Sequence, residues 1–218
     1  MDKLVDQNPG EESTERRILD AARKVFYQKG LGGARMAEIA EEAGINKALL
    51  HYYFRSKEQL FQRIFEEAFH QFFPKIAALL SGPEPVEAKI RGFVSFYTDL
   101  LREHPHLPIF VLNAIQSDPD QFAKRFITDN PAQPGQLAMQ FIHQMLNEMS
   151  AGKIRPVDPR HLIINTMAMT IFPYIARPLL MRMMNMTDAD FDQFVDARRL
   201  VVPQFVMQAI QPPAPEQE

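Results

Sequence analysis

Two short amphipathic segments joined by a glycine turn lie between residues 36 and 57, and they limit the folds open to this chain. In the first segment, apolar residues recur at the spacing of one helical face, and Gly44 follows as a residue that readily takes a positive φ at a helix C-terminus. In the second, Asn46 is a favourable N-cap and is followed by another apolar stripe at i, i+3 and i+4. The pattern predicts a helix-turn-helix.

The second segment turns small, flat and basic side chains away from its apolar stripe. These outward residues are Lys47, Ala48, Leu49, His51 and Tyr52. A helix that enters the major groove of DNA needs small or flat side chains near its N-terminus and cations beside it. No Asp or Glu lies from Gly44 to Lys57, although residues 1–60 contain ten basic and ten acidic residues. The positive charge is therefore concentrated where DNA binding would need it.

A capping signal also marks the start of the next helix. Ser56 is a suitable N-cap, and Gln59 at the third helical position would complete a capping box. Lys57, in the first turn, opposes the helix dipole and so favours an anion nearby. Because a DNA phosphate is such an anion, Lys57 is expected to contact the DNA backbone.

The stretch from Ser13 to Leu60, about a fifth of the chain, closely resembles the DNA-binding domain of the tetracycline-repressor (TetR/AcrR) family of bacterial transcription factors. The similarity is carried by ILDAARKVF, AEIAEEAGI and NKALLHYYFRSKEQLF, in which the YF pair and the SKE triplet fall at the spacing typical of the family. It implies a three-helix DNA-binding domain, a homodimer that reads a palindromic operator in double-stranded DNA, and a C-terminal domain that binds a small molecule.

Two departures from the family pattern concern the operator. The family often has Gly-Thr where this chain has Ala48 and Leu49, and Tyr-His where this chain has His51 and Tyr52. The expected DNA-binding residues are Arg35, Asn46, Lys47, Ala48, Leu49, His51, Tyr52 and Lys57. Among them, Lys47, Ala48 and Leu49 are expected to contact base edges, with Leu49 against a thymine methyl group. Those expected to contact phosphates are Arg35, His51, Tyr52 and Lys57.

The composition excludes several other classes of protein. No apolar run approaches the roughly 18 residues of a membrane span, and the N-terminus has no apolar signal region. The chain has no cysteine, so disulfides, thiolate metal sites and cysteine nucleophiles are excluded. His104 and His106 lack a third nearby ligand, so neither a metal nor another cofactor is expected. We expect a cytoplasmic protein without a membrane partner, whose net charge of -3 fits a small DNA-facing patch.

Helical periodicity continues beyond the helix-turn-helix and no strand pattern occurs, so the sequence predicts an all-α protein. The first helix is expected to begin after Ser13 or Thr14. One helix over residues 56–80 should join two domains, with Pro74 kinking or breaking it. The expected divisions are residues 1–12 as a disordered N-terminus, 13–56 as the helix-turn-helix domain, 57–210 as a helical regulatory and dimerisation domain, and 211–218 as a disordered tail.

The last third of the chain is rich in Ile, Met and Phe. Asp158 with Pro159 starts one helix, and Thr187, with an acidic residue at the third helical position, starts the last. Exposed apolar surface beyond roughly a few hundred Å² usually marks an interface. We therefore expect these two helices to pair with their copies in a twofold dimer. Arg198 and Arg199 are expected to be solvated or to form ion pairs at that interface.

Polar residues set among apolar walls are what orient a ligand. The polar candidates are Asn113, Gln116, His143, Asn165, Thr166 and Tyr174, and the candidate walls are Phe93, Phe96, Tyr97, Phe110, Met139, Met167 and Phe172. Because these walls carry no ion-pairing cluster, the implied ligand is apolar or aromatic. Each residue could instead be ordinary core, since stripes at helical spacing usually pack together.

Two other functions stay open beside that of an inducer-released repressor. The first is a DNA-binding dimer without a small-molecule inducer, controlled by a protein partner. The second is an enzyme on a helical scaffold. The chain has no paired-carboxylate spacing, Gly-rich phosphate loop or G-x-S-x-G elbow, so an enzyme is not expected.

Overall fold

The computed structural model describes the backbone of residues 9–212 and the side chains of residues 13–212. Within that part of the chain every regular element is a helix, which confirms the all-α prediction. The chain divides into two compact units. Unit 1 comprises the chain up to Phe72 together with Ile109–Ser117, and unit 2 comprises Phe73–Pro108 together with the chain from Asp118 onward.

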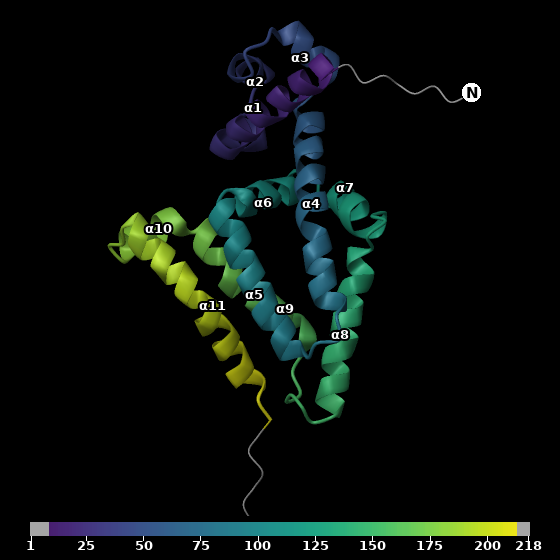
Figure 1. The fold of residues 1–218 in the computed structure, drawn as a ribbon, viewed down its shortest axis with the longest axis vertical. Coiled ribbons are helices and arrows are strands. Elements are labelled where there is room, and N and C mark those ends of the chain that lie inside the picture. Colours follow the sequence, from purple (N-terminus) through teal and green to yellow (C-terminus); the bar gives the residue numbers. More distant parts are fainter. Residues whose placement is uncertain (1–8, 213–218) are drawn as a thin grey trace, which may run out of the picture. The chain divides into compact units, whose positions relative to one another are not determined.

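Unit 1 contains the predicted helix-turn-helix (Figure 1). Its helices are α1 (Pro9–Gly33), α2 (Met36–Glu42), α3 (Lys47–Tyr53), the first part of α4 (Lys57–Ser81) and most of α6 (Leu107–Ser117). Its buried side chains include Ile18, Phe26, Ile39, Leu50, Phe61 and Ile64. These residues fall on apolar helical stripes, so burial of the stripes holds the unit together.

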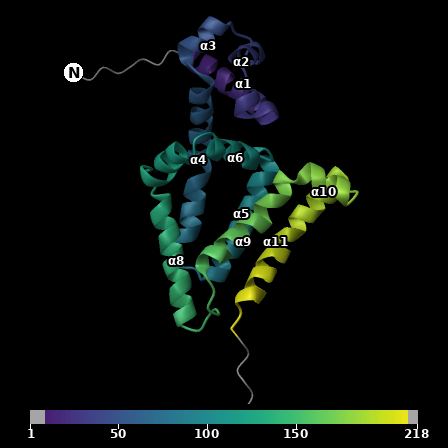
Figure 2. The same ribbon diagram turned by 180° about the vertical axis from the view of Figure 1, so that it is seen from behind.

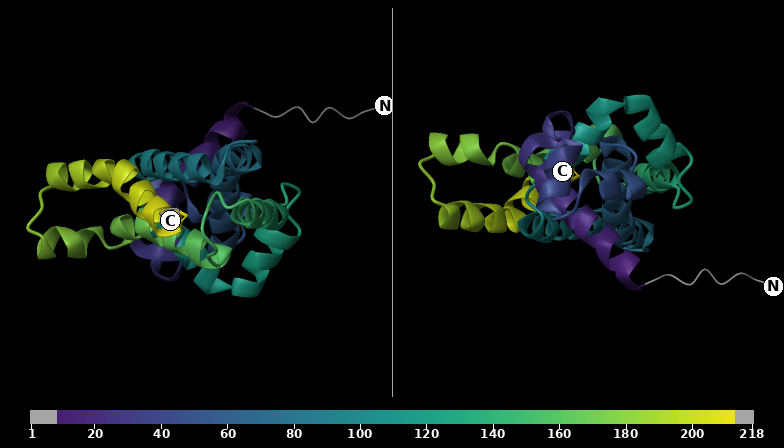
Figure 3. Two further views of the ribbon diagram at one scale, coloured as in Figure 1. Left: turned by 90° about the horizontal axis from the view of Figure 1, so that it is seen from below. Right: turned by 90° about the horizontal axis from the view of Figure 1, so that it is seen from above.

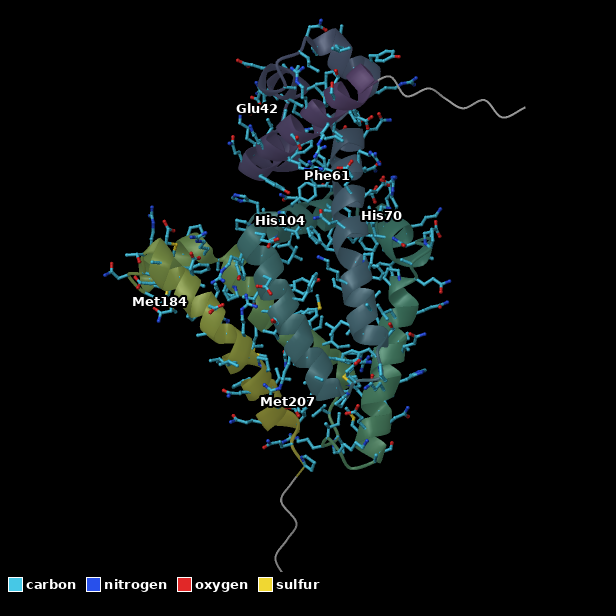
Figure 4. All side chains as sticks on the ribbon, in the orientation of Figure 1. Glu42, Phe61, His70, His104, Met184 and Met207 are labelled. Atoms are coloured by element: carbon cyan, nitrogen blue, oxygen red, sulfur yellow. The ribbon has the colours of Figure 1, made fainter. Side chains whose placement is uncertain are left out.

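Helix α6 completes the core of unit 1 through Phe110. This buried ring lies 4.3 Å from the ring of Phe61 and 5.7 Å from that of Tyr27, measured between centroids (Phe61 is labelled in Figure 4). The ring of Phe65 lies 6.1 Å away and nearly parallel. Aromatic pairs at such distances add roughly 0.5–1.5 kcal/mol each beyond the area that they bury. A segment far along the chain thus belongs to the core of unit 1, and nothing in the local sequence indicated this.

Helix α1 begins earlier than the sequence predicts. It starts at Pro9 rather than after Ser13 or Thr14, so the last part of the stretch expected to be disordered is helical. Proline suits a first helical position because its φ is already fixed near the helical value and the missing N–H would have no partner there. The predicted disorder of residues 1–8 and 213–218 concerns positions outside the described residues.

Helix α4 is continuous across Pro74, so the predicted break is absent. Proline removes one backbone hydrogen bond and crowds the preceding turn, but apolar contacts hold the helix on both sides of it. Phe65 is buried in unit 1. In unit 2 the Leu79 side chain packs closely against Gly92. A Cβ added to Gly92 would lie only 2.5 Å from Cδ1 of Leu79.

The remaining helices form unit 2 (Figures 1 and 2). They are the rest of α4, α5 (Val86–Glu103), α7 (Pro119–Ala123), the π-helical turn Lys124–Thr128, α8 (Pro134–Ser150), α9 (Pro159–Ile175), α10 (Arg177–Met183) and α11 (Asp188–Ile210). Helix α5 packs against α9 and α11, which also pack against each other. Figure 3 shows α10 and the start of α11 side by side at one edge of this unit.

Two predicted helix starts are confirmed in unit 2. Asp158 Oδ1 accepts a hydrogen bond from the N–H of Arg160 at 2.8 Å and caps α9. At α11, Thr187 Oγ1 accepts from the N–H of Asp190 at 3.2 Å, and the Asp190 carboxylate accepts from the N–H of Thr187 at 2.9 Å. Each cap gives a partner to an N–H of the first helical turn and so stabilises the start of the helix.

No single helix within residues 9–212 is long and apolar enough to cross a membrane. Helices α9 and α10 reach that length and composition only when taken together, and they are bent by 76° relative to each other.

Arg198 and Arg199 on α11 were expected to lie on a solvated face or to form ion pairs at an interface. In the structure both side chains instead contact other groups of the same chain. Arg199 forms ion pairs with Asp99 and Asp196, and the first of these joins α11 to α5. The guanidinium of Arg198 donates to the backbone oxygen of Met169 at 2.6 Å and so joins α11 to α9. Both arginines therefore fix helix positions inside unit 2.

Candidate nucleic-acid interface

The turn of the helix-turn-helix is built around Gly44, as predicted. Its φ of +64° is a value that residues with a Cβ adopt only with strain. The N–H of Ile45 donates to Ala40 O, and the N–H of Gly44 donates to Glu41 O, both at 3.0 Å. These two bonds make a Schellman ending, which stops α2 and turns the chain toward α3.

An arginine from α1 caps the same turn. The guanidinium of Arg17 donates to Ala43 O at 2.7 Å and lies 3.5 Å from Gly44 O. A cation is favoured at a helix C-terminus because the helix dipole is negative there. Nothing in the sequence marks Arg17 for this role, since it lies 26 residues from Ala43.

Helix α3 begins at the predicted cap. Asn46 has an extended backbone, and its Oδ1 accepts a hydrogen bond from the N–H of Leu49 at 2.8 Å. On the inner side, Leu50 is 0% exposed and Phe54 is also buried. The cap fixes where the helix starts, and the two apolar anchors fix which face it turns outward.

The expected base-reading residues share the open face of α3. Lys47, Ala48 and Leu49 are all exposed, Leu49 with 37% of its surface. His51 and Tyr52 are exposed on the same helix, Tyr52 with 76% of its surface. Helix α3 contains no acidic residue. The structure therefore brings these five side chains to an accessible surface without a carboxylate among them.

The cations of unit 1 fall into two groups. Several cations on α1, namely Arg23, Lys24 and Lys29, form ion pairs with acidic neighbours, as in the contact of 3.0 Å between Lys24 Nζ and Glu42 Oε1. Within the described residues, neither Lys47 nor Arg55 forms an ion pair, and both are exposed. The region on and just after α3 thus carries positive charge without an acidic partner, where a polyanion would meet it.

Arg35 is exposed directly before α2, at its N-cap position. The carboxylate next to it belongs to Glu38, which forms an ion pair of 3.1 Å with Lys29. Hydrogen bonding from Lys29, and then the backbone N–H and charge of Arg35, lower the pKa of Glu38 from its ordinary value. Because Lys29 already pairs with that carboxylate, the Arg35 guanidinium remains accessible to an added anion.

Lys57 has internal partners that the sequence did not indicate. Its Nζ donates to Leu31 O at 2.8 Å and to Ala34 O at 3.3 Å, where α1 ends. A cation at this helix end is favoured by the dipole for the same reason as Arg17. Lys57 thus holds α1 against the start of α4, and any phosphate contact would be added to this structural role.

The predicted capping box at the start of α4 forms in part. Ser56 Oγ accepts a hydrogen bond from the N–H of Gln59 at 3.2 Å. The Gln59 side chain accepts from the N–H of Arg55 at 3.1 Å, rather than from the N–H of Ser56. The box is displaced by one residue, and it still ties the segment after α3 to the first turn of α4.

The candidate ligand residues are divided between the two units. Phe110, Asn113 and Gln116 lie on α6 in unit 1, where Phe110 is core and Gln116 is exposed. The side-chain amide of Asn113 lies close to Gly30. A Cβ added to Gly30 would be 3.3 Å from the amide nitrogen of Asn113. These three residues therefore do not share a compact unit with the other candidates.

Within unit 2, an aromatic cluster gathers on α5. The rings of Phe93 and Tyr97 are 4.4 Å apart, and that of Phe96 lies edge-on to Tyr97 at 5.7 Å. Burial raises the pKa of the Tyr97 hydroxyl above its ordinary value. These three candidate residues are therefore in mutual contact on α5, which residues that form one wall of a ligand site would need to be.

The other candidates in unit 2 are spread over α8 and α9. Exposed side chains are those of Met139, His143, Asn165, Met167 and Phe172. Thr166 Oγ1 donates to Leu162 O at 2.8 Å, and Tyr174 Oη donates to Thr98 O at 3.3 Å. The two buried polar groups are thus satisfied within the protein, and their free capacity for a ligand is reduced.

Comparison with known proteins gives the same assignment as the geometry. Residues 18–64 match the family described as bacterial regulatory proteins, tetR family. The chain is 28% identical over 163 residues to the HTH-type transcriptional regulator RutR of Escherichia coli, covering 72% of this chain and 71% of RutR. It is 36% identical over 92 residues to the HTH-type transcriptional repressor NicS of Pseudomonas putida, covering 42% and 43% of the two chains.

The fold likeness extends over both units. The crystal structure of a putative transcriptional regulator from Streptomyces coelicolor superposes with a TM-score of 0.62 and 21% identity, covering 92% of this chain and 99% of that one. At this identity the likeness concerns the fold alone. The match over residues 18–64, the capped turn and the exposed α3 together show that this chain carries a helix-turn-helix domain similar to that of the tetR family of bacterial regulatory proteins, and they support a DNA-binding transcriptional regulator.

Proposed function

We propose that this regulator is a homodimeric repressor that binds a palindromic operator and is released by an apolar or aromatic small molecule. The observation that carries the proposal is the open face of α3, which is basic, capped and free of carboxylates. In this proposal residues 13–56 bind DNA and residues 57–210 provide regulation and dimerisation. The protein acts in the cytoplasm, where the chromosome is accessible.

The proposed division of labour on DNA follows from position. Lys47, Ala48 and Leu49 occupy the first turn of α3 and contact base edges in the major groove. Phosphates are contacted by Arg35, His51, Tyr52 and Lys57. Asn46 contributes indirectly, because the hydrogen bond that its side chain accepts from Leu49 N–H fixes the start of α3.

The dimer is supported by apolar side chains left open on the last long helices. On α11 the residues Leu200, Val201 and Phe205 are exposed, and on α9 Ile164 and Phe172 are exposed. Val201 and Phe205 are four residues apart and Ile164 and Phe172 are eight apart, so each pair lies on one helical face. A second copy that covers both stripes would place two α3 helices around a twofold axis, which is the symmetry of a palindrome.

The inducer is proposed to bind in unit 2 beside the aromatic cluster Phe93, Phe96 and Tyr97. A ligand can release DNA only by its differential affinity for two conformations, and helix α4 runs through both units and can link them. Repression rather than activation is supported by the name of NicS, a transcriptional repressor.

The test is selection of bound sequences from random duplex DNA at near-physiological salt, with Lys47→Ala as the control. Lys47 is exposed without a partner among the described residues, so its removal should leave the fold intact. Enrichment of a palindrome by the wild type and its loss in Lys47→Ala would support the proposal. Enrichment of a single half-site would contradict the dimer, and equal enrichment by both proteins would contradict the role of α3.

The selected site then provides a probe for the inducer. Apolar and aromatic compounds would be added to the complex, and release of DNA would be followed by fluorescence anisotropy. A releasing compound should lose its effect in Tyr97→Ala while operator affinity in its absence stays the same. Unchanged release by this variant would contradict the placement beside α5.

A further inference from the structure

Helix α9 contains a proline in its interior. Pro173 is buried, and its nitrogen carries no hydrogen. In a regular helix the N–H of residue 173 would donate to the backbone oxygen of Met169, four residues earlier. The ring also crowds that oxygen and turns it outward. Met169 O is therefore left without its helical donor.

An arginine from α11 supplies the missing donors. Arg198 Nε donates to Met169 O at 3.2 Å, and its NH2 group donates to the same oxygen at 2.6 Å. The guanidinium also lies 5.4 Å from the centre of the Phe194 ring, one turn earlier on α11. Burial lowers the pKa of Arg198, but arginine remains charged at any physiological pH. The bond is thus charge-assisted and about twice as strong as a neutral one.

This contact fixes α9 against α11 in register. A guanidinium presents its donors in a rigid plane, so two bonds to one oxygen define the direction as well as the distance. Because Pro173 has no N–H, the arginine is not competing with a helical donor for this oxygen. Sliding either helix by one residue would leave a partly buried charge and a carbonyl without partners, which is costly.

The contact also lies beside the surface that a second copy would cover. On α11, Val201 and Phe205 follow Arg198 by three and seven residues, so they lie near its side of the helix. On α9, exposed Phe172 is one turn after Met169. The relative position of the two apolar stripes therefore depends on the bond between Arg198 and Met169.

We propose that Pro173 and Arg198 act as one unit that positions the apolar stripes of α9 and α11 for pairing with a second copy of this chain. The inference rests on the homodimer proposed above. It assigns Arg198 as a positioning residue of the dimer, and it assigns Pro173 the role of opening the acceptor. Neither role is visible in the sequence, where the two residues belong to separate helices.

The test is a double-mutant cycle on dimer dissociation, measured by sedimentation of the full chain. Arg198→Met removes the donors and should raise the dimer Kd roughly tenfold or more. Pro173→Ala restores the helical N–H, so Met169 O no longer needs the arginine. In the Pro173→Ala background, Arg198→Met should therefore raise the Kd by less than about threefold.

Arg199→Met is the matched control. This neighbouring arginine also ties α11 to another helix, but through Asp99 on α5 and without involving Pro173. Its effect on the dimer Kd should be the same in both backgrounds. Arg198→Lys, which keeps the charge but has no planar fork, should fall between wild type and Arg198→Met. It also serves as the test variant if Arg198→Met does not fold, as judged by circular dichroism.

The outcomes separate this inference from the dimer itself. A wild-type dimer whose Kd is unchanged in Arg198→Met would overturn the positioning role and leave the dimer standing. Equal effects of Arg198→Met with proline or alanine at position 173 would overturn the link between the two residues. A wild-type chain that remains a monomer at all concentrations would overturn the proposed dimer and, with it, this inference.

Discussion

Leu49 and Leu50 are neighbours in sequence but serve different purposes on α3. Leu50 is fully buried, whereas Leu49 is exposed on the face proposed to read bases. Leu50→Ala should lower the free energy of unfolding by about 2–5 kcal/mol, because it leaves a cavity in the core of unit 1. Leu49→Ala should change stability by less than about 1 kcal/mol and alter the preference among operators. Thermal unfolding and binding to a panel of operator variants measure the two effects.

The pair provides its own control, since both changes remove the same atoms from the same helix. If Leu49→Ala weakened binding to all sequences equally, Leu49 would not be contacting a base. A loss of stability as large as that of Leu50→Ala would mean that Leu49 is buried in the protein that exists in solution.

Lys57 combines a structural and a proposed binding role, and the two can be separated. Lys57→Met removes the bonds to Leu31 O and Ala34 O and should lower the free energy of unfolding by about 1 kcal/mol, since the site is partly solvated. If Lys57 also contacts a phosphate, the slope of log affinity against log salt should fall by about one. Lys47→Met, without internal partners, should leave the stability unchanged. An unchanged salt slope in Lys57→Met would assign Lys57 to the fold alone.

At the scale of the element, helix ends are stabilised by specific side chains that also determine pH dependence. The Arg160 side chain, and then its backbone N–H, lower the pKa of Asp158 to about 2. This carboxylate caps α9. Because the folded pKa is below the ordinary value of about 4, the ionised carboxylate stabilises the folded state above about pH 4. That contribution is lost as the pH falls through about 2.

Asp158→Asn therefore has an effect that depends on pH. At pH 6 the melting temperature of the variant should be below that of the wild type, and the difference should shrink toward zero near pH 2. Thermal unfolding followed by circular dichroism between these limits measures it. A difference that stays constant over the range would show that the charge of Asp158 does not contribute, and that only its capping geometry matters.

At the scale of the whole molecule, local signals in the sequence were sufficient for the helices and for the open face of α3. Periodicity, the glycine at position 44 and the caps at Asn46 and Thr187 act over a few residues, so they can be read from the sequence. Contacts between distant segments could not be read in this way. Phe110 in the core of unit 1 and Arg17 on the helix-turn-helix turn both depend on chain positions that only the fold brings together.

The same reason explains why the sequence could not show which candidate ligand residues share a compact unit. An amphipathic stripe shows which side of a helix is buried, but not which other helix covers it. Lys89, for example, is a charged residue on α5, yet it is buried and its Nζ donates to Leu80 O and to Gln144 Oε1, both at 2.5 Å. That contact joins the end of α4 to α8 and has no counterpart in local sequence pattern.

In the proposed dimer, pairing of the two copies and DNA binding are linked, because a palindrome is bound tightly only when both α3 helices engage at once. Phe205 is 62% exposed on α11, so a charge there should be tolerated by the monomer and rejected by an apolar interface. Phe205→Asp should raise the dimer Kd by roughly a hundredfold or more, because burying unpaired charges beside apolar groups costs about 3 kcal/mol or more for each dimer. Affinity for the palindrome should fall with it, while affinity for an isolated half-site should stay the same. Gln193→Asp, an equal change of charge at an exposed polar position of the same helix, should leave both properties unchanged. For both variants, sedimentation would measure the dimer Kd, and DNA binding at several protein concentrations would measure the affinity for the palindrome. A Phe205→Asp protein that remained a dimer would place the interface on another face of the molecule.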